Sequence, residues 1–254
     1  MSDSEIILGL ETSTHACSIA LFYNGQFFSG LNIEPKKHSE LILPMIQSLL
    51  AEVKLTMGDI TAIAVGVGPG SFTGVRVAVG LAKAFAFALK VPVWPISSLR
   101  ALAHQVYRIN QCGPQDIVLS TWDARIQQIY WGLFQLDQSS QHKTVCSVDN
   151  QVDQLCAPHE LVISDLLEKS QGVRDNGFIV VGNGLSHYKN AVMGVIAPYN
   201  PKIIEDYYPN AQDVIELAIS DKANALLPAD LFELSPEYVR NDVAKVPQNM
   251  SLRD

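Results

Sequence analysis

The stretch Gly66-Val-Gly-Pro-Gly-Ser-Phe-Thr-Gly-Val-Arg-Val-Ala-Val-Gly-Leu-Ala-Lys-Ala-Phe-Ala-Phe-Ala-Leu-Lys90 runs from a glycine-rich loop into a long apolar segment. The apolar run 60–66 predicts a strand, and the pattern after the loop predicts a helix over Phe72–Leu89. Gly80 and several alanines would let another helix approach this one closely. Because a helix that is apolar on all sides is normally enclosed, we expect one side to pack on a sheet. The other side then needs a cover from this chain or from a partner.

The glycine-rich loop misses three common motifs. A phosphate-binding Walker loop needs Lys and then Ser or Thr after its last glycine, but Gly74 is followed by Val75 and Arg76. The spacing of Gly70 and Gly74 misses the dinucleotide fingerprint, and Ser71 lacks the flanking glycines of a nucleophile elbow. Two interpretations stay open: an anion held by free N–H groups at the start of the helix, or a tight turn that brings the backbone close to a neighbour.

The apolar segment also has about the length of a membrane span. Arg76 and Lys83 lie inside it, and its small residues keep its hydrophobicity modest. We therefore expect a helix of a folded protein and no membrane association. The N-terminal sequence Met-Ser-Asp-Ser-Glu has no basic region followed by an apolar run, so we expect no signal peptide and a cytoplasmic location.

The remaining sequence predicts two similar halves. Strands are expected over residues 5–10, 16–23, 26–33, 60–66, 91–95, 117–122, 129–136, 145–148 and 177–181. Helices are expected over residues 38–54, 72–89, 98–106, 158–167, 184–193 and 211–227. In each half a strand ends in glycines and enters a helix, which is typical of a duplicated architecture with a cleft between two lobes. We predict an N-terminal lobe at 1–108, a C-terminal lobe at 109–227 and an irregular tail at 228–254.

Composition limits the function classes. The chain has 254 residues, of which 48% are hydrophobic and 17% charged, so it can bury a substantial core. Its net charge of −8 disfavours direct binding of nucleic acid, because phosphates attract clusters of Lys and Arg. The four cysteines have no CxxC spacing and are expected to be reduced thiols. None of the six histidines has a metal-binding spacing, so no metal site is predicted.

One polar loop is a candidate for cleft chemistry. Glu11, Thr12 and Ser13 follow the first strand, and Asp123 follows the corresponding strand of the second half. Hydroxyls and amides of the loop could hold phosphate, and the two acids, facing each other across the cleft, could hold a metal through water. The alternative is a turn whose hydroxyls bond to their own backbone.

Five segments together resemble the bacterial TsaB family, also called YeaZ. They are Ile7-Leu-Gly-Leu-Glu-Thr-Ser-Thr14, Gly68-Pro-Gly-Ser-Phe-Thr-Gly-Val-Arg76, Asp123-Ala-Arg125, Tyr130-Trp131 and Tyr238-Val-Arg240. The resemblance implies the fold of actin, Hsp70 and the sugar kinases (ASKHA), with two related lobes that each have a mixed sheet flanked by helices. It also implies a role in forming N6-threonylcarbamoyladenosine (t6A) at position 37 of tRNAs that read ANN codons. There, members of the family bind and activate a catalytic paralogue, TsaD, and an ATPase, TsaE, joins them.

The resemblance also implies a partner surface. It assigns the two helices over 38–54 and 72–89 to one face that serves both homodimers and the heterodimer with TsaD. The interface residues that it implies are His38, Leu41, Ile42, Met45, Gly70, Ser71, Phe72, Thr73, Arg76, Val79 and Lys83. A vestigial nucleotide cleft would comprise Glu11, Thr12, Ser13, Asp123, Gly182 and Gly184. No cofactor is expected in the isolated subunit, ATP or ADP is expected only at the complex interface, and tRNA contact is expected to be indirect.

Departures from the catalytic relatives favour an accessory role. The metal-binding HxxxH of the catalytic paralogue is matched by Ser98 and Leu102, which cannot serve as those ligands. The kinase-like Asp-x-Gly becomes Asp123-Ala-Arg125, and Gly-Asp-Gly becomes Gly182-Asn-Gly184. The alternative is an independent enzyme of this fold, either an ATP-dependent phosphotransferase or an M22-like peptidase. A homodimer with another scaffolding role is a third hypothesis.

Overall fold

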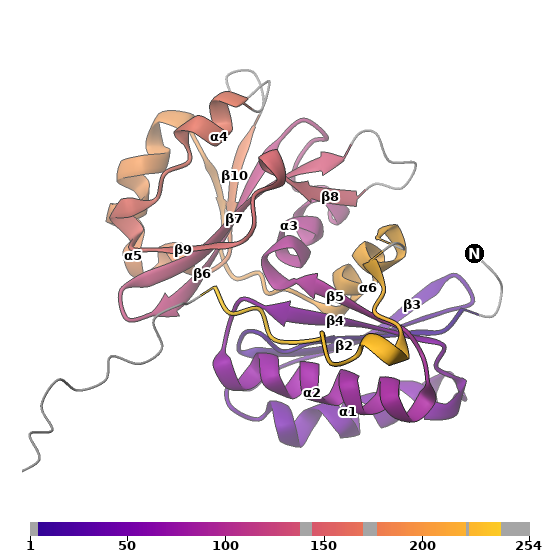
Figure 1. The fold of residues 1–254 in the computed structure, drawn as a ribbon. Helices are drawn as coiled ribbons and strands as arrows, with labels where there is room; N and C mark the ends of the chain where they lie inside the picture. The colour runs from indigo at the N-terminus through magenta and orange to yellow at the C-terminus, as the bar shows by residue number, and fades with distance from the viewer. Residues whose placement is uncertain (1–4, 138–143, 170–176, 222–223, 240–254) are drawn as a thin grey trace, which may run out of the picture.

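Two mixed β-sheets form two lobes in the computed structural model, which describes residues 5–137, 144–169, 177–221 and 224–239 (Figure 1). The first sheet has the order β3-β2-β1-β4-β5 and the second has the order β11-β10-β6-β7-β8, with β9 paired to β7. The strands of the first sheet are β1 (Ile7–Glu11), β2 (Ala16–Tyr23), β3 (Gln26–Ile33), β4 (Ala62–Gly68) and β5 (Val93–Ser97). Those of the second are β6 (Ile117–Arg125), β7 (Gln128–Asp137), β8 (Thr144–Ser147), β9 (Gln154–Cys156), β10 (Phe178–Val181) and β11 (Lys202–Ile204).

The two sheets repeat one topology. In the first, β1, β2 and β3 pair antiparallel, and β4 and β5 then continue parallel from β1. In the second, β6, β7 and β8 pair antiparallel, and β10 and β11 continue parallel from β6. The expected duplication and the expected fold of two related mixed sheets are therefore confirmed.

Helices cover both faces of the first sheet. The helices of the described residues are α1 (His38–Glu52), α2 (Phe72–Leu89), α3 (Ser98–Arg108), α4 (Ser164–Lys169), α5 (Gly184–Ile196) and α6 (Ala211–Ser220). Short 3-10 turns lie at Met57–Asp59, Val148–Asn150, Pro158–Glu160, Ala197–Tyr199 and Pro228–Asp230. The helices α1 and α2 lie side by side under the first sheet, where α1 contacts β2 and α2 contacts β4 (Figure 1). The helix α6 packs on the same sheet from the other side.

Two helices are exchanged between the lobes. The helix α3 follows β5 directly, yet it packs on β6, β7 and β8 of the second sheet. The helix α6 follows β11, yet it packs on β1, β2 and β4 of the first sheet. A predicted lobe at 109–227 would place α6 with the second sheet, so the lobes are not contiguous along the chain. One hydrophobic cluster accordingly contains residues of both lobes, including Ala64, Leu102, Val118 and Ile215.

Local signals account for most element ends. The hairpin turn between β2 and β3 has Asn24 at φ 51° and Gly25 at φ 73°, the conformation that this dipeptide favours. The side chains of Ser71 and Ser97 cap α2 and α3 by accepting hydrogen bonds from the N–H groups of Gly74 and Arg100. These helices therefore begin where the sequence predicts.

The structure contains two strands that the sequence does not predict, and it differs from two of the predicted helices. The strands β9 and β11 were not predicted, because three residues are too short for a periodic pattern. The helix predicted over 158–167 is a 3-10 turn followed by α4. The helix predicted to 227 ends at Ser220, and Leu226 instead pairs with Val93 beside β5.

By length and composition alone, α2 could cross a membrane, and among the described residues it is the sole helix of this kind. Its inward side chains pack on the first sheet instead; they include Val75, Ala78, Val79 and Ala82. One flank of α2 is covered by residues 226–239, which we call the C-terminal strap (Figure 1). In the strap, Leu231 and Leu234 are buried in the same cluster as the inward side of α2.

Candidate functional site: the interlobe cleft and the α1–α2 face

A cleft of about 930 Å³ lies where the two lobes meet. It is lined by the first residues of α1 and α2, the end of β6, the turn into β7 and the end of the C-terminal strap. From the predicted interface it gathers His38, Gly70, Ser71, Phe72, Thr73 and Arg76, and from the predicted nucleotide cleft it gathers Ser13 and Asp123. Parts of the two predicted regions therefore border the same cavity, while their other residues lie outside its lining.

The glycine-rich loop is tightly apposed to the loop after β1. The N–H of Ser71 donates to the carbonyl of Ser13 at 2.6 Å, and the hydroxyl of Thr12 donates to the carbonyl of Gly74 at 2.7 Å. A Cβ on Gly70 would lie 2.3 Å from the Ser13 carbonyl oxygen, and one on Gly74 would lie 2.0 Å from that of Thr12. These glycines are thus needed for a close backbone approach, which was one of the two open interpretations.

Gly74→Ala is expected to destabilise the chain by about 2–3 kcal/mol, because the new methyl group would overlap backbone that cannot move aside. Urea unfolding monitored by circular dichroism measures this loss. Gly194→Ala in α5 is the matched control, since a Cβ there meets no atom within 4 Å and should leave stability unchanged or raised. Equal effects of the two substitutions would contradict the apposition.

Glu11 lies inside the first lobe and does not line the cleft. Its carboxylate accepts hydrogen bonds from the Ser13 N–H at 2.6 Å and from the Ser98 hydroxyl at 2.7 Å. Complete burial raises the pKa of Glu11, although these hydrogen bonds oppose the shift. The predicted pair of acids facing each other across the cleft is therefore wrong: Glu11 is enclosed by β4 and α3, and only Asp123 reaches the cavity.

Asp123 is already engaged by its own lobe. Its carboxylate accepts hydrogen bonds from the Arg125 N–H at 2.9 Å and from the Tyr188 hydroxyl at 3.3 Å, and it pairs with the Arg125 guanidinium at 3.4 Å. Arg125 has φ 64° and reaches His15 across the cleft at 3.3 Å. A bulky cation thus stands beside the Asp123 carboxylate in the lining of the cleft.

Gly182 and Gly184 also lie outside the cleft lining. A Cβ on Gly182 would be 2.1 Å from the Thr121 carbonyl oxygen, and one on Gly184 would be 2.6 Å from Thr121 Cβ. These glycines bring the start of α5 against β6, so their role is packing. Between them, Asn183 does line the cleft, and its side-chain oxygen accepts the N–H of Asp123 at 2.9 Å.

The side chains of α1 and α2 divide into those that point into the first lobe and those that point outward. Val79 and Ile42, both predicted interface residues, are only 3% and 2% exposed and belong to the core of the first lobe. His38 is also buried, and its Nε2 bonds to the Thr14 carbonyl at 2.9 Å. In the free chain Val79 and Ile42 therefore point into the first lobe and are not available to a partner, whereas His38 stands in the lining of the cleft.

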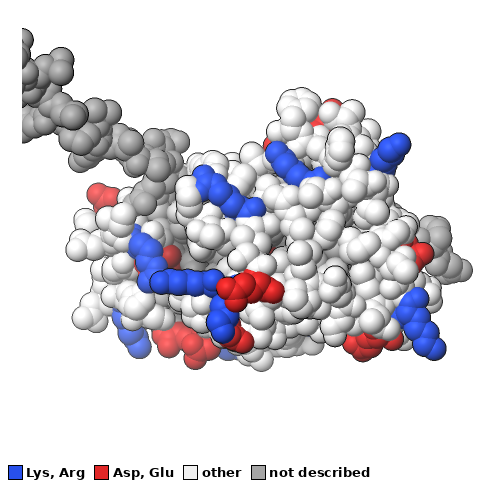
Figure 2. All heavy atoms as spheres, turned by 90° about the horizontal axis from the view of Figure 1, so that it is seen from below, with Lys and Arg blue, Asp and Glu red and all other residues white. Residues whose placement is uncertain are grey.

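The outward residues of α1 and α2 form what we call the α1–α2 face. Its exposed members are Leu43, Phe72, Thr73, Arg76, Gly80, Ala84 and Phe87, with Leu41, Met45 and Lys83 half-buried at its edges. Figure 2 shows the molecule from this side; uncharged atoms dominate, and charged side chains are scattered over it. Phe72 and Phe87 are 62% and 77% exposed, so apolar side chains stand open to solvent. The second lobe does not cover this face.

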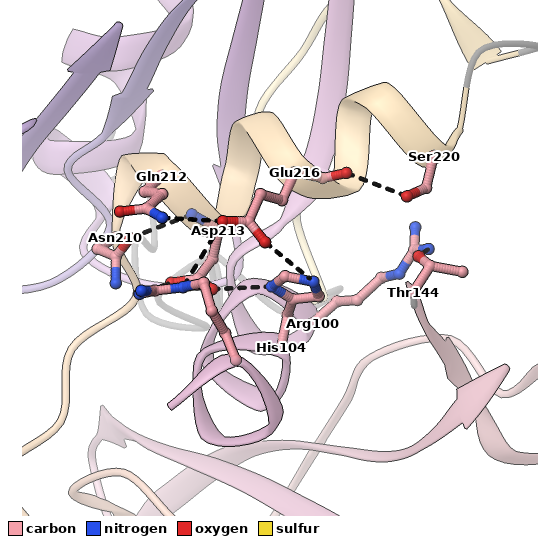
Figure 3. Close-up of polar contacts among 9 residues, drawn as sticks. Arg100, His104, Thr144, Asn210, Gln212, Asp213, Glu216 and Ser220 are labelled. Atoms are coloured by element: carbon pink, nitrogen blue, oxygen red, sulfur yellow. Dashed lines mark hydrogen bonds and ion pairs between the residues drawn. The ribbon is translucent and has the colours of Figure 1, made fainter. Parts of the chain in front are cut away.

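A polar network between the exchanged helices fixes the cleft (Figure 3). Asp213 of α6 is fully buried and accepts two hydrogen bonds from Arg108 of α3, at 2.8 and 2.9 Å. His104 bonds to the same carboxylate at 2.8 Å. One helical turn earlier, Arg100 makes a two-pronged ion pair with Asp221 after α6. Because α3 packs mainly on the second sheet and α6 mainly on the first, these contacts link the two lobes.

Metal chemistry has little support in the described residues. No three His, Cys, Asp or Glu side chains of the described ranges are grouped as metal ligands. The four cysteines, all described, are free thiols, as expected. The Ser98 hydroxyl is bonded to Glu11, and Leu102 is buried in the core, so neither could hold a metal.

Several cleft residues could not be found from sequence. Trp122 and Tyr130, which pair across β6 and β7, line the cavity together with Asn183 and Glu237 from distant parts of the chain. The sequence indicated two cleft residues, Tyr130 and Tyr238, because both lie in the family segments quoted above. Arg240 of those segments lies outside the described residues.

Comparison with known proteins places this geometry in a family. Residues 32–248 match the family model of TsaD, described as tRNA N6-adenosine threonylcarbamoyltransferase. The chain is 33% identical to "tRNA threonylcarbamoyladenosine biosynthesis protein TsaB" of Haemophilus influenzae, covering 93% of this chain and 94% of that protein. It is 29% identical to the protein of the same name from Escherichia coli, covering 94% and 96%. The solved structure of YeaZ from Pseudomonas aeruginosa superposes with a TM-score of 0.76 at 29% identity, covering 92% of this chain and 99% of that one.

Proposed function

The chain belongs to the TsaB family, also called YeaZ, and from this premise we propose how it takes part in t6A biosynthesis. It is a non-catalytic accessory subunit that binds and activates a TsaD-like catalytic paralogue. The observation that carries the proposal is the α1–α2 face, a helical surface with exposed apolar side chains and few charges that its own second lobe leaves open. Exposed apolar patches of this kind mark protein interfaces.

The state of the cleft supports an accessory role. Glu11 is enclosed, Asp123 is paired with Arg125, and Ser98 and Leu102 stand where the catalytic paralogue carries metal ligands. A cation in place of glycine would obstruct close approach of a phosphate to the end of β6. The chain's contribution is therefore a surface, while the transfer of the threonylcarbamoyl group belongs to the paralogue.

The proposal also includes a tRNA substrate, a second protein partner and a homodimer. The substrate is position 37 of tRNAs that read ANN codons, in the cytoplasm, and a TsaE-like ATPase joins the complex. The net charge of −8 supports an indirect contact with tRNA. Without the paralogue, two copies of the chain associate through the α1–α2 face, because the exposed apolar area favours self-association.

ATP or ADP is proposed only at the shared interface. Arg76 and Lys36 supply positive charge around the cleft, and the start of α2 supplies backbone N–H groups. His38 Nδ1 is buried in its lining without a hydrogen-bond partner among the described residues. These groups fit a phosphate-bearing ligand, which would supply negative charge there; the chain's residues would bind and orient it.

The test is threonylcarbamoyl transfer to tRNA by the TsaD-like paralogue, with and without this chain. We expect no transfer by the chain alone, and a rate that rises and saturates as the chain is added to the paralogue. Isothermal titration with ATP and Mg²⁺ on the isolated chain is the parallel measurement. Turnover of ATP, or cleavage of peptides, by the purified chain would favour the phosphotransferase or peptidase alternative and contradict the accessory role.

A further inference from the structure

The C-terminal strap brings an aromatic ring to the first turn of α2. Its two buried leucines anchor the strap in the core of the first lobe, and the N–H of Glu237 donates to the Val67 carbonyl at 2.7 Å. The next residue, Tyr238, lines the interlobe cleft together with Phe72 and Arg76. The strap is thus fixed immediately before Tyr238, so the fold sets the position of this ring relative to α2.

The Arg76 guanidinium lies against two aromatic rings. Its central carbon is 3.2 Å from the centroid of the Phe72 ring, one turn earlier in α2, and 5.3 Å from that of Tyr238. Both distances are within the roughly 6 Å range of cation–π attraction. Because Phe72 belongs to the same helix whereas Tyr238 comes from the strap, both contacts are made together only when the strap is seated.

The N–H groups of Arg76 are left unused by this packing. Contact with aromatic rings takes up the face of a guanidinium, while its N–H donors lie in the plane around its edge. The Arg76 side chain makes no hydrogen bond or ion pair within the described part of the chain, and it is exposed. These donors are therefore open to an acceptor that this part of the chain does not supply.

A partner that covers the α1–α2 face must compensate this charge. Arg76 is the charged residue among the exposed members of that face, and the others are apolar or small. Burying a cation without a counter-charge is costly, whereas a carboxylate can accept two parallel hydrogen bonds from a guanidinium. A complementary surface therefore needs an acidic side chain opposite Arg76.

We propose that Tyr238 is a positioning residue, which together with Phe72 holds the Arg76 guanidinium ready to receive a carboxylate of the TsaD-like partner. The identity of the partner rests on the proposed function, whereas the ring contact belongs to the isolated chain. Holding the guanidinium in place favours association, because a free arginine side chain loses conformational freedom when it binds. The strap thereby prepares the α1–α2 face from outside its two helices.

Relaxation of the ¹⁵N nucleus in the Arg76 Nε–H group tests the ring contact in the isolated full chain. We expect this group to be ordered in the wild type and in Tyr238→Phe, which keeps the ring, and mobile in Tyr238→Ala. Phe232→Ala is the matched control: Phe232 is a 76% exposed aromatic residue of the same strap, and its ring has no cation–π or ring contact among the described residues. Equal order in the wild type and Tyr238→Ala would overturn the positioning role.

Hydrogen exchange at the Glu237 amide shows whether the strap stays seated in these variants. Tyr238 is 50% exposed, whereas Leu231 and Leu234 are buried, so Tyr238→Ala should leave the bond from Glu237 to Val67 protected. Loss of this protection in Tyr238→Ala would show that the ring anchors the strap instead, and it too would overturn the positioning role.

Titration calorimetry of the full chain with the TsaD-like paralogue tests the consequence for association. Arg76→Gln should weaken association by at least about thirtyfold, and Tyr238→Ala by about three- to tenfold. Tyr238→Phe should bind like the wild type. In an Arg76→Gln chain, Tyr238→Ala should have no further effect, because the ring acts through the guanidinium. An undiminished effect of Tyr238→Ala in that chain would contradict this.

The outcomes separate this inference from the accessory role. If the wild-type chain does not bind the paralogue, the proposed function fails and the partner carboxylate fails with it, while the order of Arg76 still reports on the ring contact. If Arg76→Gln weakens association and Tyr238→Ala does not, the α1–α2 face is the interface and Tyr238 has no part in positioning Arg76.

Discussion

Gly80→Glu should abolish binding to the TsaD-like partner while leaving the chain folded. Gly80 is exposed at the middle of α2, and a Cβ added there meets no atom within 4 Å. In the free chain the substitution should stabilise α2 by about 0.5–1 kcal/mol, since glycine is a poor residue in a helix interior. In the complex it would bury an unpaired charge, which costs about 3–5 kcal/mol and corresponds to an association weaker by about 150-fold to 5,000-fold.

The chain provides a matched control for this experiment. Gly194 is also an exposed mid-helix glycine whose added Cβ meets nothing within 4 Å, but it lies on α5 of the second lobe. Gly194→Glu should leave association unchanged. Binding is measured by titration calorimetry with the paralogue, and self-association by analytical ultracentrifugation. If Gly80→Glu binds as tightly as Gly194→Glu, the α1–α2 face is not the interface.

Only the structure distinguishes Gly80 from its neighbour Val79 as a site for an added charge. From the sequence, a charge at Val79 looked equally suitable, because the helix is apolar on all sides. Val79 is 3% exposed and packs in the first lobe, so Val79→Asp would unfold the chain and could not report on the interface. The neighbouring residue, Gly80, points outward and separates the two effects.

Asp213→Ala should destabilise the chain by about 3–5 kcal/mol, the second large effect that we expect. Removing this fully buried carboxylate would leave the Arg108 guanidinium and the His104 ring without their shared partner between α3 and α6. Urea unfolding gives the free energy directly. Glu205→Ala, at an exposed carboxylate, is the control and should change stability by less than about 0.5 kcal/mol.

A double-mutant cycle separates the network from simple loss of packing. Combined with Arg108→Ala, Asp213→Ala should cost clearly less than the sum of the two single substitutions, because the second change removes the charge that the first left unpaired. Strict additivity would show that the two side chains act independently and that the network does not hold the lobes together.

Local chemistry made much of the fold predictable. The sequence predicts the starts of α1 and α2, the Asn24-Gly25 turn and the Ser97 cap, because each depends on a few neighbouring residues. The duplication was readable because both halves repeat a glycine-terminated strand before a helix. The strands β9 and β11 were not, because their three residues form only through pairing with β7 and β10.

The candidate site was less predictable than the fold. Glu11 and Asp123 occupy the corresponding strand ends in the two halves, yet one is enclosed and the other is exposed to the cleft. The difference comes from Ser98 of α3, which bonds Glu11 inside the first lobe. No property of the two loops alone carries that information.

The sequence by itself determined that the segment from Phe72 to Leu89 is a helix that needs cover on opposite sides, and the quoted family segments identified its relatives. Only the tertiary structure decided which residues of that helix face inward, that the C-terminal strap covers one flank, and that α3 and α6 exchange lobes. The physical reason is that a helix apolar all round has no polar side to fix its orientation. The order of the strands beneath it, set by pairings between distant residues, fixes that orientation instead.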